Sequence, residues 1–156
     1  MITSLLVGLP VMLLCLMLQA VFLIVCLRRY ARFRQIQPQS DQPLQDILLL
    51  ALIMLLLLLG NFLQITVWAG LFVLLGEFDS FTTALYFSGV NFTTLGYGDI
   101  VMSAQWRLLG PLEAANGILM FGVSTAAMTA AMMDMLKHSR RNMPAIHASN
   151  DQTTQP

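Results

Sequence analysis

Three long stretches of this chain carry almost no charge, and this feature limits the folds open to it more than any other. Residues 1–27 and 47–76 contain no charged side chain, and residues 108–133 contain one, Glu113. A helix needs about 20 apolar residues to cross the hydrocarbon core of a bilayer. Each stretch is long enough, so we predict an all-α membrane protein with three transmembrane helices. The first stretch lacks a basic start and is too long for a signal peptide, so we interpret it as a retained helix.

Charge is scarce and its placement predicts a topology. Only 10% of the residues are charged and the formal net charge is zero, so we expect a lipid bilayer as surroundings and no nucleic acid as partner. Positive residues beside a membrane span stay in the cytoplasm. Seven of the eight Lys and Arg residues follow the first or the third stretch, and Arg107 is the exception. We therefore predict an outside amino terminus and an inside carboxyl terminus.

A glycine-containing motif lies between the second and third stretches. Residues 93–99 read T-T-L-G-Y-G-D. Gly96 and Gly98 can adopt positive φ, and alternating such residues with ordinary ones can turn successive carbonyls the same way. Carbonyl oxygens that face one axis can replace the water around a cation, with four copies completing each ring. The predicted oxygen layers are the Thr94 hydroxyl and the carbonyls of Thr94, Leu95, Gly96 and Tyr97.

The residues before this motif predict a short helix. Asp79 or Ser80 can cap a helix over residues 81–92, which is too short to cross a bilayer at about 1.5 Å per residue. A half-crossing helix followed by an irregular segment is a re-entrant loop, which protein or water must shield. The negative end of such a helix would favour a cation near the membrane centre.

Residues 84–99, A-L-Y-F-S-G-V-N-F-T-T-L-G-Y-G-D, resemble the pore helix and selectivity filter of potassium channels. The resemblance extends over about residues 46–135. It implies a small homotetrameric potassium channel of the two-transmembrane type in a bacterial plasma membrane, with K⁺ as the permeant ion, no cofactor and no catalysis. A weakly selective cation channel, a non-conducting subunit that assembles with other pore subunits, and a potassium transporter subunit stay open as alternatives. The implied filter consists of Thr94, Leu95, Gly96, Tyr97, Gly98 and Asp99.

The same resemblance assigns supporting roles around the filter. Tyr86, Val90 and Thr93 occupy filter-supporting positions. The family has a pair of pore-helix tryptophans where this chain has Tyr86 and Phe87, and several bacterial members have a glutamate in place of Val90. Valine offers no polar group to Asp99, so we expect the Tyr86 phenol to donate a hydrogen bond to that acid. Leu95 stands where the family motif has valine or isoleucine. This departure is mild, because the filter uses the carbonyl of this residue and not its side chain.

The third stretch resembles the inner helix of the family. Gly117 matches the hinge glycine, and Phe121, Thr125 and Thr129 match the pore-lining face. Their i, i+4, i+8 spacing places these three on one stripe independently of the resemblance. Packing through small residues is the alternative reading of that stripe.

Two acids of this stretch have open roles. Glu113 is a functional candidate because intramembrane carboxylates usually are. It is a first-turn acid if the helix begins at Pro111, whereas a family-like start near Ser103 would make Pro111 a kink. Asp134 is either a cation-concentrating acid at the inner mouth or a solvated helix-end acid.

These interpretations divide the chain into four parts. The predicted parts are an extra amino-terminal transmembrane helix over 1–27, a cytoplasmic Arg- and Gln-rich linker over 28–45, a pore module over 46–137 and a disordered cytoplasmic tail over 138–156.

Overall fold

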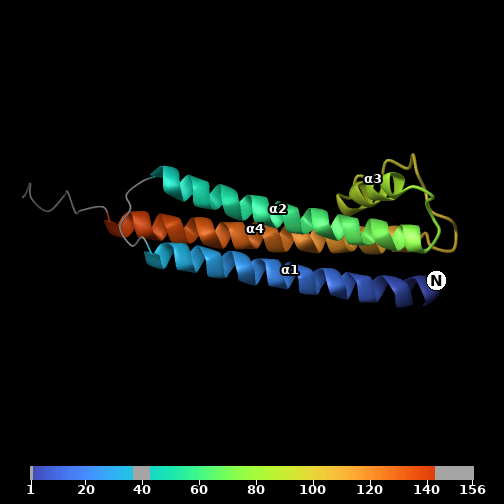
Figure 1. Ribbon diagram of the computed structural model, residues 1–156, viewed down its shortest axis with the longest axis horizontal. Helices are drawn as coiled ribbons and strands as arrows, with labels where there is room; N and C mark the ends of the chain where they lie inside the picture. The colour runs from blue at the N-terminus through green and yellow to red at the C-terminus, as the bar shows by residue number, and fades with distance from the viewer. Residues whose placement is uncertain (1, 37–42, 143–156) are drawn as a thin grey trace, which may run out of the picture.

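The computed structural model describes residues 2–36 and 43–142, and this part of the chain is all-helical. Three long helices and one short helix follow one another (Figure 1). They are α1 (Ile2–Ile36), α2 (Pro43–Leu74), α3 (Phe81–Phe92) and α4 (Leu109–Asn142). The all-α prediction is confirmed, and the bounds of α3 agree with the predicted residues 81–92.

The three long helices are long and apolar enough to cross a membrane, as predicted. Their candidate spans are Ile2–Arg29, Ile47–Leu74 and Leu109–Met135. The helices lie side by side, and each packs against the other two (Figure 1). The short helix α3 lies at the end of the bundle where α1 begins, α2 ends and α4 begins, and it packs against α2 and α4.

Three helices extend beyond the predicted boundaries, and α2 does so by beginning at Pro43, inside the predicted linker. α1 continues to Ile36, so much of the predicted linker over 28–45 is helical. α4 continues to Asn142, so the tail predicted from residue 138 begins no earlier than residue 143. Arg, Gln and Lys are good helix formers, and a helix therefore continues past the point where the apolar run ends. The remainder of the linker, 37–42, and of the tail, 143–156, lies outside the described residues.

The start of α4 differs from both predicted alternatives. α4 begins at Leu109, and hydrogen-bonded turns precede it, with Trp106 N–H donating to Ser103 O at 3.2 Å and Leu109 N–H to Trp106 O at 2.9 Å. Pro111 falls in the first turn, where a missing N–H leaves no intrahelical partner unsatisfied. Pro111 is therefore neither the first helical residue nor a kink.

An aromatic cluster holds α3 against α2. The rings of Phe72 and Phe87 meet edge to face with centroids 5.4 Å apart, and Trp68 lies 5.9 Å from Phe72. All three side chains are buried. Such contacts add directional preference to the burial of apolar area, so the cluster sets how α3 lies on α2.

Buried amides connect the long helices near the middle of the bundle. Gln64 of α2 donates to Gln19 Oε1 of α1 at 2.8 Å, and Gln19 donates to Ser124 Oγ of α4 at 3.2 Å. Asn116 of α4 donates to Gln64 Oε1 at 3.4 Å. Polar groups in a membrane interior need such partners, so this chain of amides attaches α1 to the other two helices.

Candidate functional site

The end of α3 is built by a left-handed residue that is not glycine. Thr94 has φ +63°, and its N–H donates to Asn91 O at 2.8 Å while Leu95 N–H donates to Val90 O at 2.9 Å. This pair of bonds is the Schellman pattern, which closes a helix and usually has glycine in the left-handed position. A threonine there costs about 1–2 kcal/mol, so the surrounding structure holds the turn in place.

Backbone angles alternate through the motif that follows. Thr94, Gly96 and Gly98 have positive φ, at +63°, +55° and +77°, and Leu95 and Tyr97 between them do not. The N–H groups of Thr94 and Leu95 point back to α3, and Gly96 N–H makes a longer contact of 3.4 Å to Val90 O. Because a trans peptide group is planar, the carbonyls of the preceding residues point away from the end of α3.

The side chains of this segment are exposed on the single chain. Residues 93–99 are all exposed, and the apolar side chains of Leu95 and Tyr97 expose 57% and 66% of their surface. Exposed apolar side chains gathered on one segment indicate a surface that contacts another molecule or a membrane.

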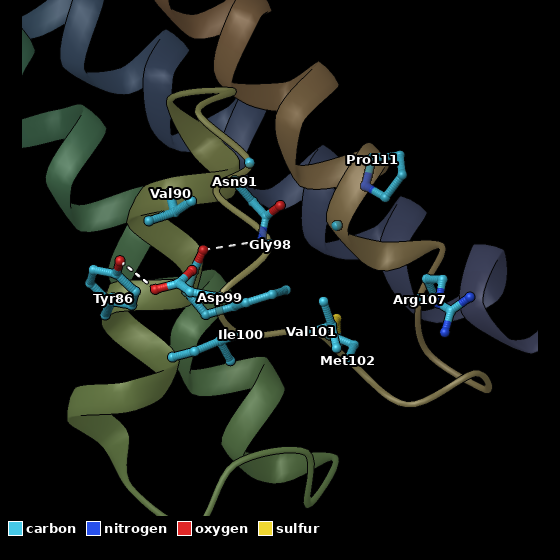
Figure 2. Close-up of a pocket in the computed structure, with 13 residues that line it drawn as sticks. Tyr86, Val90, Asn91, Gly98, Asp99, Ile100, Val101, Met102, Arg107 and Pro111 are labelled. Atoms are coloured by element: carbon cyan, nitrogen blue, oxygen red, sulfur yellow. Dashed lines mark hydrogen bonds between the residues drawn. The ribbon is translucent and has the colours of Figure 1, made fainter.

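The hydrogen bond predicted between Tyr86 and Asp99 is confirmed. The Tyr86 hydroxyl donates to Asp99 Oδ2 at 2.7 Å (Figure 2). This bond to a carboxylate raises the pKa of Tyr86 above its usual range, because it stabilises the protonated phenol. Tyr86 and Asp99 line a cavity of about 250 Å³ (Figure 2). Val90, Arg107 and Pro111 line the same cavity.

A second carboxylate, Glu77, braces the segment after the motif. Glu77, in the α2–α3 connection, accepts from Ser103 N–H at 2.8 Å and from Ser103 Oγ at 2.6 Å. These two bonds to a charged acceptor join the chain before α3 to the chain after the motif. The partners are 26 residues apart, and no local pattern in the sequence indicates the pairing.

The residues predicted to line the pore share an exposed stripe of α4. Phe121, Thr125 and Thr129 are all exposed on the single chain. The Thr125 hydroxyl donates to Phe121 O at 2.8 Å and the Thr129 hydroxyl to Thr125 O at 2.9 Å, within their own helix. The Phe121 ring also meets Phe92, the last residue of α3, edge to face at 5.7 Å. Pore lining stays a prediction for these residues.

Gly117 lies where the backbone of α4 closely approaches the end of α3. A Cβ atom at this position would lie 1.9 Å from Phe92 O and 2.8 Å from Phe92 C. Only glycine permits that approach. The structure thus gives a packing reason for this glycine, and the hinge role stays a prediction.

The two acids of α4 have different environments. Glu113 is completely buried, and the first turn of α4 contains no acid. The reading of Glu113 as a first-turn acid is therefore wrong, and Oε1 of this residue pairs with Ser88 of α3. Asp134 is exposed, and its role stays a prediction.

The family model for ion channels matches residues 52–134, just over half of the chain. The chain belongs to this ion channel family. The match spans most of α2, all of α3 and most of α4, and it leaves α1 outside the part shared with the family. Together with the three candidate spans, it identifies a multi-pass membrane protein of the ion channel type. No curated protein sequence and no solved structure matches the chain.

Proposed function

We propose that this ion channel is a potassium-selective homotetramer of a bacterial plasma membrane, with residues 94–99 as its selectivity filter. The observation that carries the proposal is the alternation of positive φ at Thr94, Gly96 and Gly98 directly after α3. This alternation, with N–H groups directed back to the helix end, is the backbone geometry that can present successive carbonyls to one axis. In an ion channel, such carbonyls have a use in replacing the hydration shell of K⁺.

The proposed tetramer follows from what a single chain lacks. One chain supplies one oxygen at each level, and a dehydrated cation needs a ring of them. The exposed apolar side chains of Leu95, Tyr97 and Phe121 need neighbours, which three further copies would provide. Four chains would then surround an axis lined by the filter and by the exposed stripe of α4.

Membrane placement completes the proposal. We infer that α3 enters the membrane from outside and returns as a re-entrant loop, since a 12-residue helix covers only about 18 Å. Glu77 and the Tyr86–Asp99 pair would then brace the outer mouth. The arginines that follow residue 27, and the carboxyl-terminal part of α4, would face the cytoplasm.

Potassium flux tests this function. The full chain, reconstituted in liposomes, is expected to release K⁺ down its gradient and to leave Na⁺ inside in a matched preparation. Equal release of both ions would favour the weakly selective channel. Absence of flux from a preparation with tetrameric mass would favour the non-conducting subunit, and a mass other than that of four chains would refute the homotetramer.

A further inference from the structure

A fully buried acid lies between three helices at the back of α3. Glu113 of α4 and Ser88 of α3 have no exposed surface. The Ser88 Oγ atom lies within hydrogen-bonding distance of two acceptors, Glu113 Oε1 and, at 2.8 Å, the carbonyl oxygen of Ile65 in α2. The serine therefore connects α2, α3 and α4 at one point.

The hydrogen bonds of the Ser88 hydroxyl indicate whether the Glu113 carboxyl group is protonated. A hydroxyl carries one proton and can donate only one hydrogen bond at a time, whereas the Ile65 carbonyl can only accept. If Ser88 donates to Ile65, the bond between Ser88 and Glu113 requires a proton on the carboxyl group. The other carboxyl oxygen, Oε2, is buried with no hydrogen-bond partner among the described residues. A charged carboxylate in that position would be costly, and a neutral one much less so.

The next turn of the two helices shows why this contact matters for conduction. Glu113 and Gly117 are four residues apart in α4, and Ser88 and Phe92 are four residues apart in α3, so both pairs lie on one contact line. At Gly117 the backbone of α4 touches the carbonyl of Phe92, and the proposed filter begins two residues later, at Thr94. A change at the Glu113–Ser88 contact would therefore alter how α3 presents the filter.

We propose that Glu113 is a positioning residue of the pore: its protonated carboxyl group donates to Ser88 and fixes α3, and the filter that follows it, against α4 and α2. This inference rests on the proposed function, because it assigns the filter to the segment after α3. The titratable group near Glu113 from α1 is the Cys15 thiol, which is close enough for an electrostatic interaction. Ser88 from α3 and the Ile65 carbonyl from α2 carry no charge.

Infrared spectroscopy tests the proton without requiring conduction. The full chain in liposomes is expected to show the band of a protonated carboxyl group at neutral pH, and Glu113→Gln is expected to lose it. The glutamine has nearly the same shape and keeps an N–H donor for Ser88, so this variant is expected to assemble. No such band in the parent, or an unchanged band in Glu113→Gln, would overturn the protonated form whether or not the protein conducts.

Single-channel recording tests the positioning role. We expect Glu113→Leu and Ser88→Ala each to shorten the open-state lifetime by about 2- to 10-fold, the range for loss of one hydrogen bond, and Glu113→Gln to match the parent. Asn116→Leu is the matched control: it removes another buried polar group of α4 whose partner, Gln64, is in α2, and the lifetime is expected to stay unchanged. Parent lifetimes in both Glu113→Leu and Ser88→Ala, or lifetimes shortened equally in Asn116→Leu, would overturn the role.

The pH profile adds a readout that a purely structural role would not change. In a Cys15→Ala background, raising the pH while staying below about 10, the usual pKa of tyrosine, is expected to shorten the open-state lifetime of the channel. Removal of the Glu113 carboxyl proton removes the donor to Ser88, whereas Tyr86 keeps its proton in this range because its pKa is raised. The same background with Glu113→Gln is expected to show a flat profile. Identical profiles for the two proteins would contradict the proposal. A parent that passes no potassium would refute the proposed function, and the infrared result would then still decide whether the Glu113 carboxyl group is protonated.

Discussion

Gly117→Ala adds one methyl group at a close backbone contact between α4 and α3. The new Cβ would lie 1.9 Å from Phe92 O, 2.8 Å from Phe92 C and 3.2 Å from Phe92 Cα, whereas ordinary contacts begin at 3.4 Å. The three obstructing atoms are backbone atoms at the end of α3, so no side-chain rotation can relieve the clash. The two helices would have to separate by about 1.5 Å, the difference between 1.9 Å and 3.4 Å.

That separation has an energetic and a functional cost. Overpacking of a well-packed interior typically costs 1–3 kcal/mol, and a tetramer would carry the clash in each subunit. The Glu113–Ser88 contact and the Phe92–Phe121 ring contact, one turn to either side of Gly117, would open with it. We expect Gly117→Ala to lower the thermal unfolding midpoint of the purified protein by several degrees and to abolish selective potassium flux.

Gly122→Ala is the matched control for this substitution. Gly122 lies in the same helix, and a Cβ there would meet nothing within 4 Å. Both changes carry the same gain of about 1 kcal/mol in helix propensity, so the difference between the variants isolates the contact with Phe92. Thermal unfolding measured side by side should place Gly122→Ala at or above the parent. If Gly117→Ala were as stable as Gly122→Ala and conducted normally, the close packing of α4 on α3 would be wrong.

Three further predictions concern the filter and the topology. Gly96→Ala places a methyl group on a residue at φ +55°, which costs about 1–2 kcal/mol per subunit. Flux assays should show that potassium selectivity is lost while the tetrameric mass is retained, and unchanged selectivity would argue against the filter. Tyr86→Phe removes the donor to Asp99 and should change the open-state lifetime without altering assembly, so recordings identical to the parent would show that this bond has no role in conduction. In a cysteine-free background, Ser80→Cys should react with an impermeant reagent applied outside and Lys137→Cys should not; both positions are exposed on the single chain, and the reverse labelling pattern would overturn the topology.

Local patterns in the sequence were enough to predict the elements and one hydrogen bond, but not the contacts between distant segments. The absence of charge over about 20 or more residues predicts each span. Ser80 occupies the N-cap position of α3, as one of the two predicted candidates, but its side chain makes no capping hydrogen bond, so the helix start was predicted and the capping bond was not. The Tyr86–Asp99 bond was also predictable. The family resemblance placed both residues beside the filter, and because Val90 has no polar group, the Tyr86 phenol was the donor expected for Asp99. Each of these inferences depends on residues that are close together in the chain.

Contacts between distant residues could not be predicted in the same way. The Glu77–Ser103 and Glu113–Ser88 pairs are separated by 26 and 25 residues, and their partners are brought together by the packing of α3 against α2 and α4. The extension of α1 to Ile36 escaped prediction for another reason. An apolar run marks the part of a helix within the membrane, whereas hydrogen bonding and helix propensity determine where the helix ends.

The reversal potential under biionic conditions tests the central claim most directly. The full chain in a planar bilayer, with K⁺ on one side and Na⁺ on the other, isolates selectivity from conductance. A filter built on the alternating backbone of Thr94, Gly96 and Gly98 predicts current carried by K⁺ and a reversal potential far from zero, in the direction set by the potassium gradient. A reversal potential near zero with sustained current would contradict potassium selectivity.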